Sequence, residues 1–478
     1  MRITNANNDT RKGRKRSMDT QTYIKEVPVS SAVDDVVVGG GPAGLAAAIS
    51  SARTGATTML IETNGYLGGN LTAGLVGPCM TSYSLDGSIQ LIKGVFEDFV
   101  NRMVDMGAAI HPSNTRAGDA YSGFIVYGHD KVTPFEPEAA KIVANRMCTE
   151  AGVILRFHSS VVDVSVEDGR ATGVVIADKE GLHVQPAARI VDCSADGDVV
   201  AFAGGATEYG RPSDSMVQPM TLFFRVTDVD DDAVQEYVSQ HPDEIRPFAS
   251  LIEHAREEGT FKLPRRGVGL YRTMRKGVWR INTSRVLGKN GTKASDLSAA
   301  EIEGREQVMM LMDFFRSELP GFANAQLLDT AATIGVRETR RIVGEYVLTV
   351  EDLQGPTEFD DVIALCGYPV DIHDPAGTGG GASDHYSTAN GYEIPFRALV
   401  PRDLDNVVVA GRCVSATHEA LGAIRVMPPS FAMGQAAGTA AALSVVENVR
   451  LRDIDVPSLQ RQLLQDNAYL GERHLAAV

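Results

Sequence analysis

Apolar and polar residues alternate along the chain in a pattern that predicts an α/β protein. Three consecutive valines, residues 36–38, are typical of a buried parallel strand, and a glycine turn then leads into an alanine-rich helix that runs to about Arg53. A second apolar strand at residues 57–61 ends in the acid Glu62. Because strand, turn, helix and strand follow in this order, they predict the opening unit of a parallel sheet.

Further elements follow this unit. Apolar residues at helical spacing predict helices from Leu91 to Gly107 and from Glu136 to Ala151. Three strands with alternating apolar positions are then expected, at residues 153–157, 161–166 and 171–177. The later part of the chain is expected to contain a strand at 220–226, helices near 233–258 and 298–318, a buried strand at 406–411, a helix of small residues beginning near Gly434 and a last helix at 456–467.

Together these elements predict a Rossmann-like nucleotide-binding domain, whose parallel sheet carries added antiparallel strands, and an inserted α+β substrate or cap domain. The expected divisions are a flexible N-terminal tail (1–32), the first part of the nucleotide-binding domain (33–211), the cap region (212–400), a return segment (401–445), and a C-terminal helix and tail (446–478).

The glycines of the first turn have the spacing of a dinucleotide-binding site. Gly39 allows the tight turn, Gly41 lets a pyrophosphate approach the backbone, and Gly44 lets the helix pack closely on the strand. The phosphates would lie at a helix N-terminus, where free N–H groups favour negative charge. Glu62 lies about 20 residues after the glycines, where an acid meets the ribose hydroxyls and argues against a 2'-phosphate.

Composition excludes several other classes of protein. A net charge of -16 argues against nucleic acid as a partner, and the basic run at residues 11–16 is interpreted as part of a solvated tail, with a targeting role as the alternative. No apolar stretch approaches a membrane span or a signal-peptide core, so a soluble, cytoplasmic protein is expected. The five cysteines are scattered without a C-x-x-C pair, which indicates neither a disulfide framework nor a metal site.

With these segments in place, about residues 33–445 resemble FAD-dependent oxidoreductases of the glutathione-reductase-like type, which have two dinucleotide-binding folds. More narrowly, the chain is similar to the poorly characterised family called FAD-dependent oxidoreductase. The motifs that carry this resemblance are residues 38–44, 192–198, 218–221, 335–344 and 409–420, continued at 425–427 and 434–438.

The resemblance implies FAD as the cofactor. The turn residues Gly39, Gly41, Pro42, Ala43 and Gly44 would hold the pyrophosphate. Glu62 would bind the adenosine ribose, and the backbone of Val162 would face the adenine. The N-terminus of the helix near Gly434 would face the flavin and stabilise its reduced, negatively charged form. The remaining expected FAD contacts are Gly69, Asn70, Ser194, Asp198, Gly411, Arg412, Gln435 and Ala436.

Flavin chemistry also needs a group that takes or gives a proton and a charge that fixes the substrate. His418, in the loop expected to face the flavin, is the first candidate, because its pKa suits proton transfer near neutral pH. Arg337 and Arg425 are candidates for binding a carboxylate or phosphate, and His373 for lining the site. The alternatives are a hydrogen-bonded structural histidine for His418, ion pairs within the fold for the arginines, and a loop cap for His373.

The function expected from these residues is hydride transfer between FAD and a small organic substrate by an enzyme of the dehydrogenase or oxidase type. A flavoprotein monooxygenase is an alternative, although a second glycine-rich motif for a nicotinamide is absent. A flavin electron-transfer subunit of a multi-chain complex is another. The substrate, the electron acceptor and any homo-oligomer or redox partner are left open.

Overall fold

The computed structural model describes residues 22–244, 246–265, 267–355, 357–377, 380–382 and 388–477. The basic run at 11–16 lies outside the described residues. Over the described ranges, no helix combines the length and the apolar character needed to cross a membrane.

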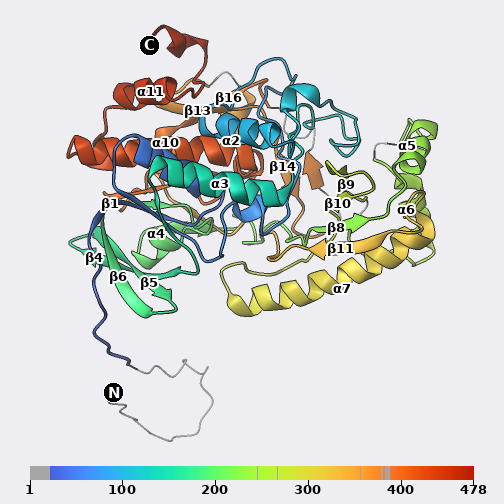
Figure 1. Ribbon diagram of the computed structural model, residues 1–478, viewed down its shortest axis with the longest axis horizontal. Coiled ribbons are helices and arrows are strands. Elements are labelled where there is room, and N and C mark those ends of the chain that lie inside the picture. The colour runs from blue at the N-terminus through green and yellow to red at the C-terminus, as the bar shows by residue number, and fades with distance from the viewer. Residues whose placement is uncertain are drawn as a thin grey trace, which may run out of the picture.

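A seven-stranded sheet forms the centre of the first unit, with β17 paired to β6 and the other strands in the order β3-β2-β1-β6-β5-β4 (Figure 1). The pairs β1–β2, β2–β3, β1–β6 and β17–β6 are parallel, whereas β4 and β5 add antiparallel pairs. The predicted fold class is therefore confirmed. The strands are β1 (Val33–Val38), β2 (Thr58–Ile61), β3 (Ile154–Arg156), β4 (Ser160–Glu167), β5 (Arg170–Asp178), β6 (Gly181–Asp192) and β17 (Val407–Val409).

Two helices built from small residues pack closely beside this sheet. They are α1 (Pro42–Arg53) and α10 (Met427–Val446). A Cβ added at Gly434 would lie 2.1 Å from the carbonyl oxygen of Ala43, so only glycine permits this approach. The expected start of α10 near Gly434 is wrong, because the helix begins at Met427. The prolines that follow this residue occupy the first turn, where a helix does not need their N–H groups.

The expected helices near the start of the chain are present with slightly shorter bounds, as α2 (Gly94–Asp105) and α3 (Pro137–Ala151). The remaining helices of the first unit are short or terminal: α4 (Asp198–Phe202), α8 (Val350–Gln354), α9 (His418–Ile424) and α11 (Val456–Gln465).

A second unit has its own antiparallel sheet and hydrophobic core, in the strand order β11-β8-β10-β9. Figure 1 shows this sheet with α5, α6 and α7 at the end of the molecule opposite β4 and β5. Phe315, Trp279 and Phe322 are buried in its core. The helical region expected at 233–258 is two helices. The elements are β8 (Phe224–Thr227), α5 (Asp231–Gln240), α6 (Ala249–Glu257), β9 (Leu270–Arg272), β10 (Trp279–Ile281), α7 (Ala294–Glu318) and β11 (Gln326–Thr330).

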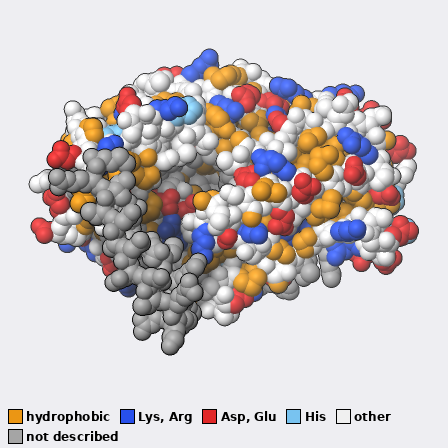
Figure 2. All heavy atoms as spheres, turned by 90° about the horizontal axis from the view of Figure 1, so that it is seen from below, with side chains coloured by type: hydrophobic (Ala, Val, Ile, Leu, Met, Phe, Trp, Pro, Cys, Tyr) orange, Lys and Arg blue, Asp and Glu red, His pale blue; other side chains and the backbone are white. Residues whose placement is uncertain are grey.

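Three two-stranded sheets complete the fold. The third of them presents Asp371 and His373 from strand β14, two residues apart and therefore on one face of the strand. The pairs are β7 (Thr207–Tyr209) with β12 (Arg340–Ile342), β13 (Val362–Cys366) with β16 (Tyr392–Pro395), and β14 (Asp371–His373) with β15 (Gly380–Ala382). On the face of the molecule shown in Figure 2, acidic and basic side chains are interspersed.

Candidate active site

The carboxyl ends of the parallel strands bring three distant segments to one edge of the sheet. Val38 at the end of β1 pairs with Asp192 at the end of β6, and Val409 at the end of β17 pairs with the same residue. The turns after these strands therefore meet at one place. In open α/β sheets, ligands bind in the crevice at this edge.

The glycine turn after β1 has the shape that an anionic pyrophosphate needs. Gly39 has φ +95°, which suits glycine, and a Cβ at Gly44 would lie 1.7 Å from the Gly39 carbonyl oxygen. A Cβ at Gly41 would instead face open space, with the Cα of Gly69 as its nearest neighbour at 4.0 Å. No side chain caps α1, and Pro42 occupies its first position, so the free N–H groups that follow can receive a phosphate.

Glu62 is held in a fixed position beside this turn. Its buried carboxylate accepts hydrogen bonds from the backbone N–H groups of Gly40 (2.7 Å) and Asn64 (2.8 Å). Val162, in β4, is 42% exposed and lies close along the chain to Ser160, whose hydroxyl is 3.4 Å from that of Thr63. The two residues expected at the adenosine end of FAD are thus in neighbouring segments.

The turn after β6 is organised by its own acids. Ser194 donates from its hydroxyl to Asp192 (2.6 Å) and accepts from the backbone N–H of Asp198 (2.9 Å). Asp198 forms an ion pair with Arg340, and burial raises the pKa of this carboxyl to about 6. Ser194 and Asp198 therefore shape the turn through contacts within the protein.

Arg412 ties this turn to the one after β17. Its guanidinium donates to the carbonyl oxygen of Ala195 (2.9 Å) and pairs with Asp196 (2.5 Å). Asp196 was not among the expected site residues, although it stands in the same acidic motif. The backbone of Gly411, with φ +93°, lies against α1, where its Cβ position is 3.3 Å from the side chain of Ala43.

Two expected FAD contacts lie away from the first turn of α10. The side-chain amide of Gln435 accepts from the N–H of Val95 (3.0 Å) and donates to the carbonyl oxygen of Asp466 (3.2 Å). Ala436 is fully buried in the core. Because α10 begins at Met427 and Pro428 and Pro429 have no N–H, this terminus offers at most the N–H groups of Val426 and Met427, and both residues line a cavity.

We call this cavity the inner cavity; it is lined by Asn70, Arg412, Val426 and Met427 from the first unit and by Thr221, Phe223 and Arg337 from segments next to the second. Several of these residues come from the turns at the sheet edge. They could hold the ring end of a dinucleotide whose phosphates lie at the glycine turn.

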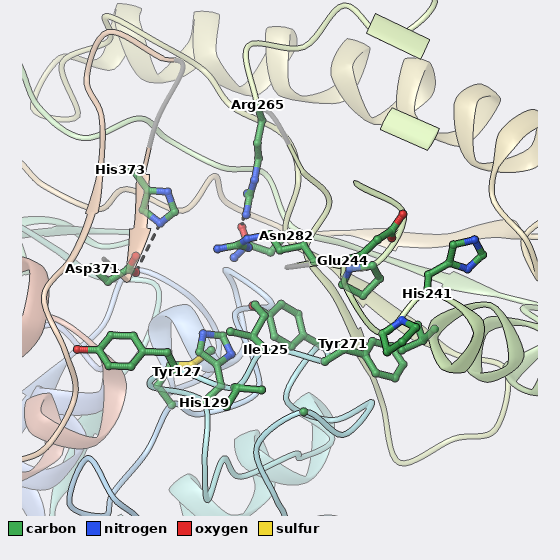
Figure 3. Close-up of a pocket in the computed structure, with 18 of the residues that line it drawn as sticks. Ile125, Tyr127, His129, His241, Glu244, Arg265, Tyr271, Asn282, Asp371 and His373 are labelled. Carbon is green, nitrogen blue, oxygen red and sulfur yellow. Dashed lines mark hydrogen bonds and ion pairs between the residues drawn. The ribbon is translucent and has the colours of Figure 1, made fainter. Parts of the chain in front are cut away.

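A larger outer cavity of about 550 Å³ adjoins the inner one. Residues that line both cavities are Met80, Asn282, Tyr368, Asp371 and His373, and we call them the shared wall. Figure 3 shows the outer cavity with Arg265, Asn282, Asp371 and His373 on one side and Tyr271 and His129 on another. A volume of this size suits a small organic molecule.

The partners of its two ring nitrogens determine where His373, in the shared wall, carries its proton. Arg285 donates from Nη2 to its Nδ1 (2.9 Å), so Nδ1 carries no proton and Nε2–H points at Asp371 Oδ2 (3.5 Å; Figure 3). Burial lowers the pKa of His373 well below its ordinary value, so the imidazole is neutral at pH 7. Both ring nitrogens are therefore engaged.

Asp371 is an anion in the same wall. Burial alone would raise its pKa, but the hydrogen bond from His373 and the positive charges of Arg425 and Arg337 hold it well below the usual range. The Tyr368 hydroxyl also approaches Asp371, at 3.3 Å. The sequence carried a signal for this residue, since Asp371 and His373 alternate on one strand.

The two candidate arginines differ in their partners. Arg425 donates to the carbonyl oxygen of Asp371 (2.8 Å) and lies 3.3 Å from its carboxylate, which fits an ion pair within the fold. Arg337 donates instead to neutral oxygens, of Pro219 (2.6 Å) and Thr221 (2.8 Å). No carboxylate among the described residues lies within ion-pair distance of Arg337, and loss of hydration on burial lowers its pKa.

His418 lies in a closed buried network. It is 2% exposed, and its Nδ1 is 2.9 Å from Glu338 Oε1, which also accepts from Arg341 (2.6 Å). Over the described part of the chain, neither cavity is lined by His418, whereas His373 lines both. This environment is that of a hydrogen-bonded structural histidine.

No motif or periodicity in the sequence marks Arg265, Asn282, Tyr271 and His129, which come from irregular or short segments. His129 donates from Nδ1 to the carbonyl oxygen of Ser122 (2.9 Å), which leaves its Nε2 without a proton. Burial lowers its pKa to about 4. Within the described ranges, no cluster of His, Cys, Asp or Glu side chains is arranged to bind a metal ion.

Similarity to known proteins shows which family the chain belongs to. The model of the family described as "FAD dependent oxidoreductase" matches residues 34–463. A thiamine thiazole synthase from Desulfosudis oleivorans is 28% identical over 170 residues, which cover 35% of this chain and 55% of that protein, so the match spans about half of the relative's length.

Two solved structures are similar at low identity. A p-nitrophenol 4-monooxygenase from Pseudomonas putida has 13% identity and a TM-score of 0.45, covering 93% of this chain and 88% of that one. A geranylgeranyl bacteriochlorophyll reductase-like protein from Thermoplasma acidophilum has 13% identity and a TM-score of 0.39, covering 92% and 84%. At these scores the likeness carries no statement about chemistry.

The family model covers most of the chain, including the glycine turn, the acidic turn and the residues that line the inner cavity. The protein belongs to the FAD dependent oxidoreductase family of enzymes, with FAD as its cofactor.

Proposed function

We propose that this enzyme transfers hydride between FAD and a small organic substrate, and that the reaction takes place at the shared wall. The observation that carries the proposal is the junction of the two cavities at Asn282, Tyr368, Asp371 and His373. One cavity is built from turns at the ligand-binding edge of the sheet. The other is large enough for a substrate and is lined by charged and aromatic side chains.

FAD, when bound, supplies a ring that exchanges hydride with a substrate carbon. The turn from Gly39 to Gly44, which includes Pro42 and Ala43, would hold its pyrophosphate. Glu62 would hold the ribose and the backbone of Val162 the adenine. Asn70, Arg412 and Met427 would hold the ring. The open space in front of Gly41 and the uncapped start of α1 support this assignment.

The residues of the shared wall would accept the proton that the substrate releases on oxidation. Asp371 is the one carboxylate among the described residues that lines both cavities, and its negative charge lets it accept a hydrogen bond from a substrate hydroxyl or amine. It would take the proton that this group releases on oxidation. His373 would act as a positioning residue, because its Nε2–H points at the carboxylate.

The arginines would have separate roles. Arg425 would balance the charge of Asp371, to which it is already bonded. Arg337, which donates to neutral oxygens and has no carboxylate partner among the described residues, would present its guanidinium to the ring or the substrate. His418 would have a structural role in holding Glu338. The alternative is a direct role in proton transfer, and mutation of His418 distinguishes the two.

The experiment that tests the proposal is anaerobic. The FAD-loaded protein is mixed with alcohols, amines and hydroxy acids, and the visible flavin absorbance is followed. Loss of absorbance on adding one compound alone supports the proposal. If every compound fails while dithionite still reduces the flavin, the proposal is wrong.

The same assay distinguishes the proposed function from two others. A monooxygenase would show flavin reduction only with NADH or NADPH, and the substrate would then be oxygenated when air is admitted. An electron-transfer subunit would be reduced only by a protein partner. A cytoplasmic location and a homo-oligomer remain predictions, which fractionation and light scattering would test.

A further inference from the structure

Arg265 is a buried cation that points into the outer cavity and has no acidic partner among the described residues. The residue is 8% exposed, and Figure 3 shows its guanidinium directed toward the middle of the cavity. The hydrogen bond found for it within the described residues is long, 3.4 Å to Asn282 Oδ1. No carboxylate in this part of the structure lies within ion-pair distance of Arg265.

The backbone fixes this arginine in place. Arg256, on α6, donates to the carbonyl oxygens of Leu263 (3.0 Å) and Arg265 (2.9 Å), so the segment that carries Arg265 is tied to a helix. A buried side chain on a fixed segment loses little freedom when it binds a ligand. This rigidity favours a built binding site over a chance orientation.

Several arginines gather around the outer cavity within the described part of the chain. Arg246 lines the same cavity, and Arg337 and Arg285 lie close enough to influence the charge of Arg265. The carboxylate of Asp371 is already paired with Arg425 and His373. Burial lowers the pKa of Arg265 to about 9, so its guanidinium still carries its charge at pH 7. Buried charges in proteins are normally paired.

The carboxylate of Glu244, the other acid that lines this cavity, already accepts hydrogen bonds from other groups of the protein. It accepts hydrogen bonds from the N–H groups of Ala249 (3.1 Å) and Ser250 (3.1 Å) at the start of α6, and from the hydroxyl of Tyr237 (3.2 Å). Its negative charge is therefore stabilised by that helix terminus. Among the described residues, no acid of this cavity is thus left to pair with Arg265, and an anionic ligand would supply the missing charge.

The remaining walls of the outer cavity are formed by aromatic residues together with aliphatic ones such as Ile125 and Val126. Tyr271 and Tyr368 are buried with their hydroxyl groups un-ionised, because burial raises the pKa of both phenols. Phe124 closes another side and stacks on Trp279 at 6.1 Å. Flat apolar walls of this kind favour a planar, apolar ligand body.

We propose that the substrate is an aromatic carboxylic acid whose carboxylate binds Arg265 and whose ring lies against Tyr271 and Phe124. Two guanidinium N–H groups match two carboxylate oxygens, which explains an arginine at this place. The position of the reacting group beside Asp371 rests on the proposed function, but the binding of the acid does not.

The test measures binding to the FAD-loaded protein without any reaction. Benzoate, phenylacetate and 3-phenylpropionate are titrated by calorimetry, each beside its uncharged amide and beside inorganic phosphate. We expect at least one acid to bind about tenfold or more tightly than its amide, since hydrogen bonds to charged groups discriminate by this much. Tighter binding of inorganic phosphate than of any of the acids would overturn the carboxylate assignment.

Substitutions test whether the acid binds at Arg265. Arg265→Met should weaken binding of the acid by about 10- to 100-fold, and Arg265→Lys should recover part of it, with an unchanged flavin spectrum and melting temperature. Arg305→Met, which removes an exposed arginine paired with Glu301 on α7, should bind the acid like wild type. Equal affinities of acid and amide, or unchanged affinity in Arg265→Met, would overturn the proposal.

The outcomes also separate this inference from the proposed function. If a small molecule reduces the flavin but none of the acids binds better than its amide, hydride transfer stands and the substrate class is wrong. If the acids bind through Arg265 but no compound reduces the flavin, the binding site stands and the proposed function is wrong.

Discussion

Gly41 allows cofactor binding to be tested separately from folding. Its backbone is extended, with φ -71° and ψ -172°, a conformation that alanine also adopts. An added Cβ would meet no atom of the protein closer than the Cα of Gly69, at 4.0 Å. Gly41→Ala should therefore leave the apoprotein as stable as wild type or more stable, by about 0.4–1 kcal/mol, because alanine has less freedom in the unfolded chain.

The same methyl group would stand where the pyrophosphate approaches the backbone. A hydrogen bond to a charged group is worth about 1.5–3 kcal/mol. Losing one or two such bonds would weaken FAD binding by about 1.5–6 kcal/mol, or roughly 10- to 10,000-fold. Stability and cofactor affinity should thus change in opposite directions.

Gly44→Ala is the matched control. Its Cβ would lie 1.7 Å from the Gly39 carbonyl oxygen, so α1 would have to move away from β1. Overpacking of this kind costs about 1–3 kcal/mol or more, and it should lower the melting temperature of the apoprotein itself.

The assay is a titration of apoprotein with FAD, followed by flavin fluorescence, together with thermal melting with and without FAD. Gly41→Ala should melt like wild type without FAD, and its melting temperature should rise little when FAD is added. Wild-type affinity for FAD in Gly41→Ala, or a lower apoprotein melting temperature, would refute the placement of the pyrophosphate.

Further predictions concern the shared wall and the core. Asp371→Asn should retain FAD but slow flavin reduction by the substrate by about 10²- to 10⁴-fold, measured by rapid mixing; a rate close to wild type would remove Asp371 from proton transfer. His418→Ala should lower the free energy of unfolding by about 1–3 kcal/mol, because Glu338 loses a buried partner, and should leave flavin reduction nearly unchanged; slow reduction with unchanged stability would assign His418 to catalysis. Burial raises the pKa of Asp35 to about 7, above about 4 in the unfolded chain, so folded protein binds the proton more tightly. Stability from this group should therefore fall as pH rises from about 4 to about 7, and Asp35→Asn should flatten that slope in urea unfolding; an unchanged slope would contradict the raised pKa.

Local patterns in the sequence predicted the FAD-binding half of the fold. The strand, glycine turn and helix that end at Arg53 depend on neighbours in the chain, so they could be read directly. The start of α10 could not, because Pro428 and Pro429 resemble a helix break when the first turn is not known. Gln435 was consequently expected at the cofactor, whereas its amide binds Val95 and Asp466.

The candidate site was predicted less completely, for a physical reason. Arg337 and Arg425 stand in the motifs that carry the family resemblance, and they line the inner cavity together with His373. Arg265 and Asn282 come from the second unit, and only the folding of that unit against the first brings them to the cavity. Nothing in their own sequence neighbourhood shows that Arg265 is buried with no acid among the described residues beside it.

A structure of the FAD-loaded protein with a bound aromatic acid would test the roles assigned to the two cavities. It should place the pyrophosphate at Gly41, the flavin ring against Asn70, Arg412 and Met427, and the acid between the ring and Arg265, with its reacting group beside Asp371. A flavin ring outside the inner cavity, or one separated from the outer cavity by protein, would contradict the central claim.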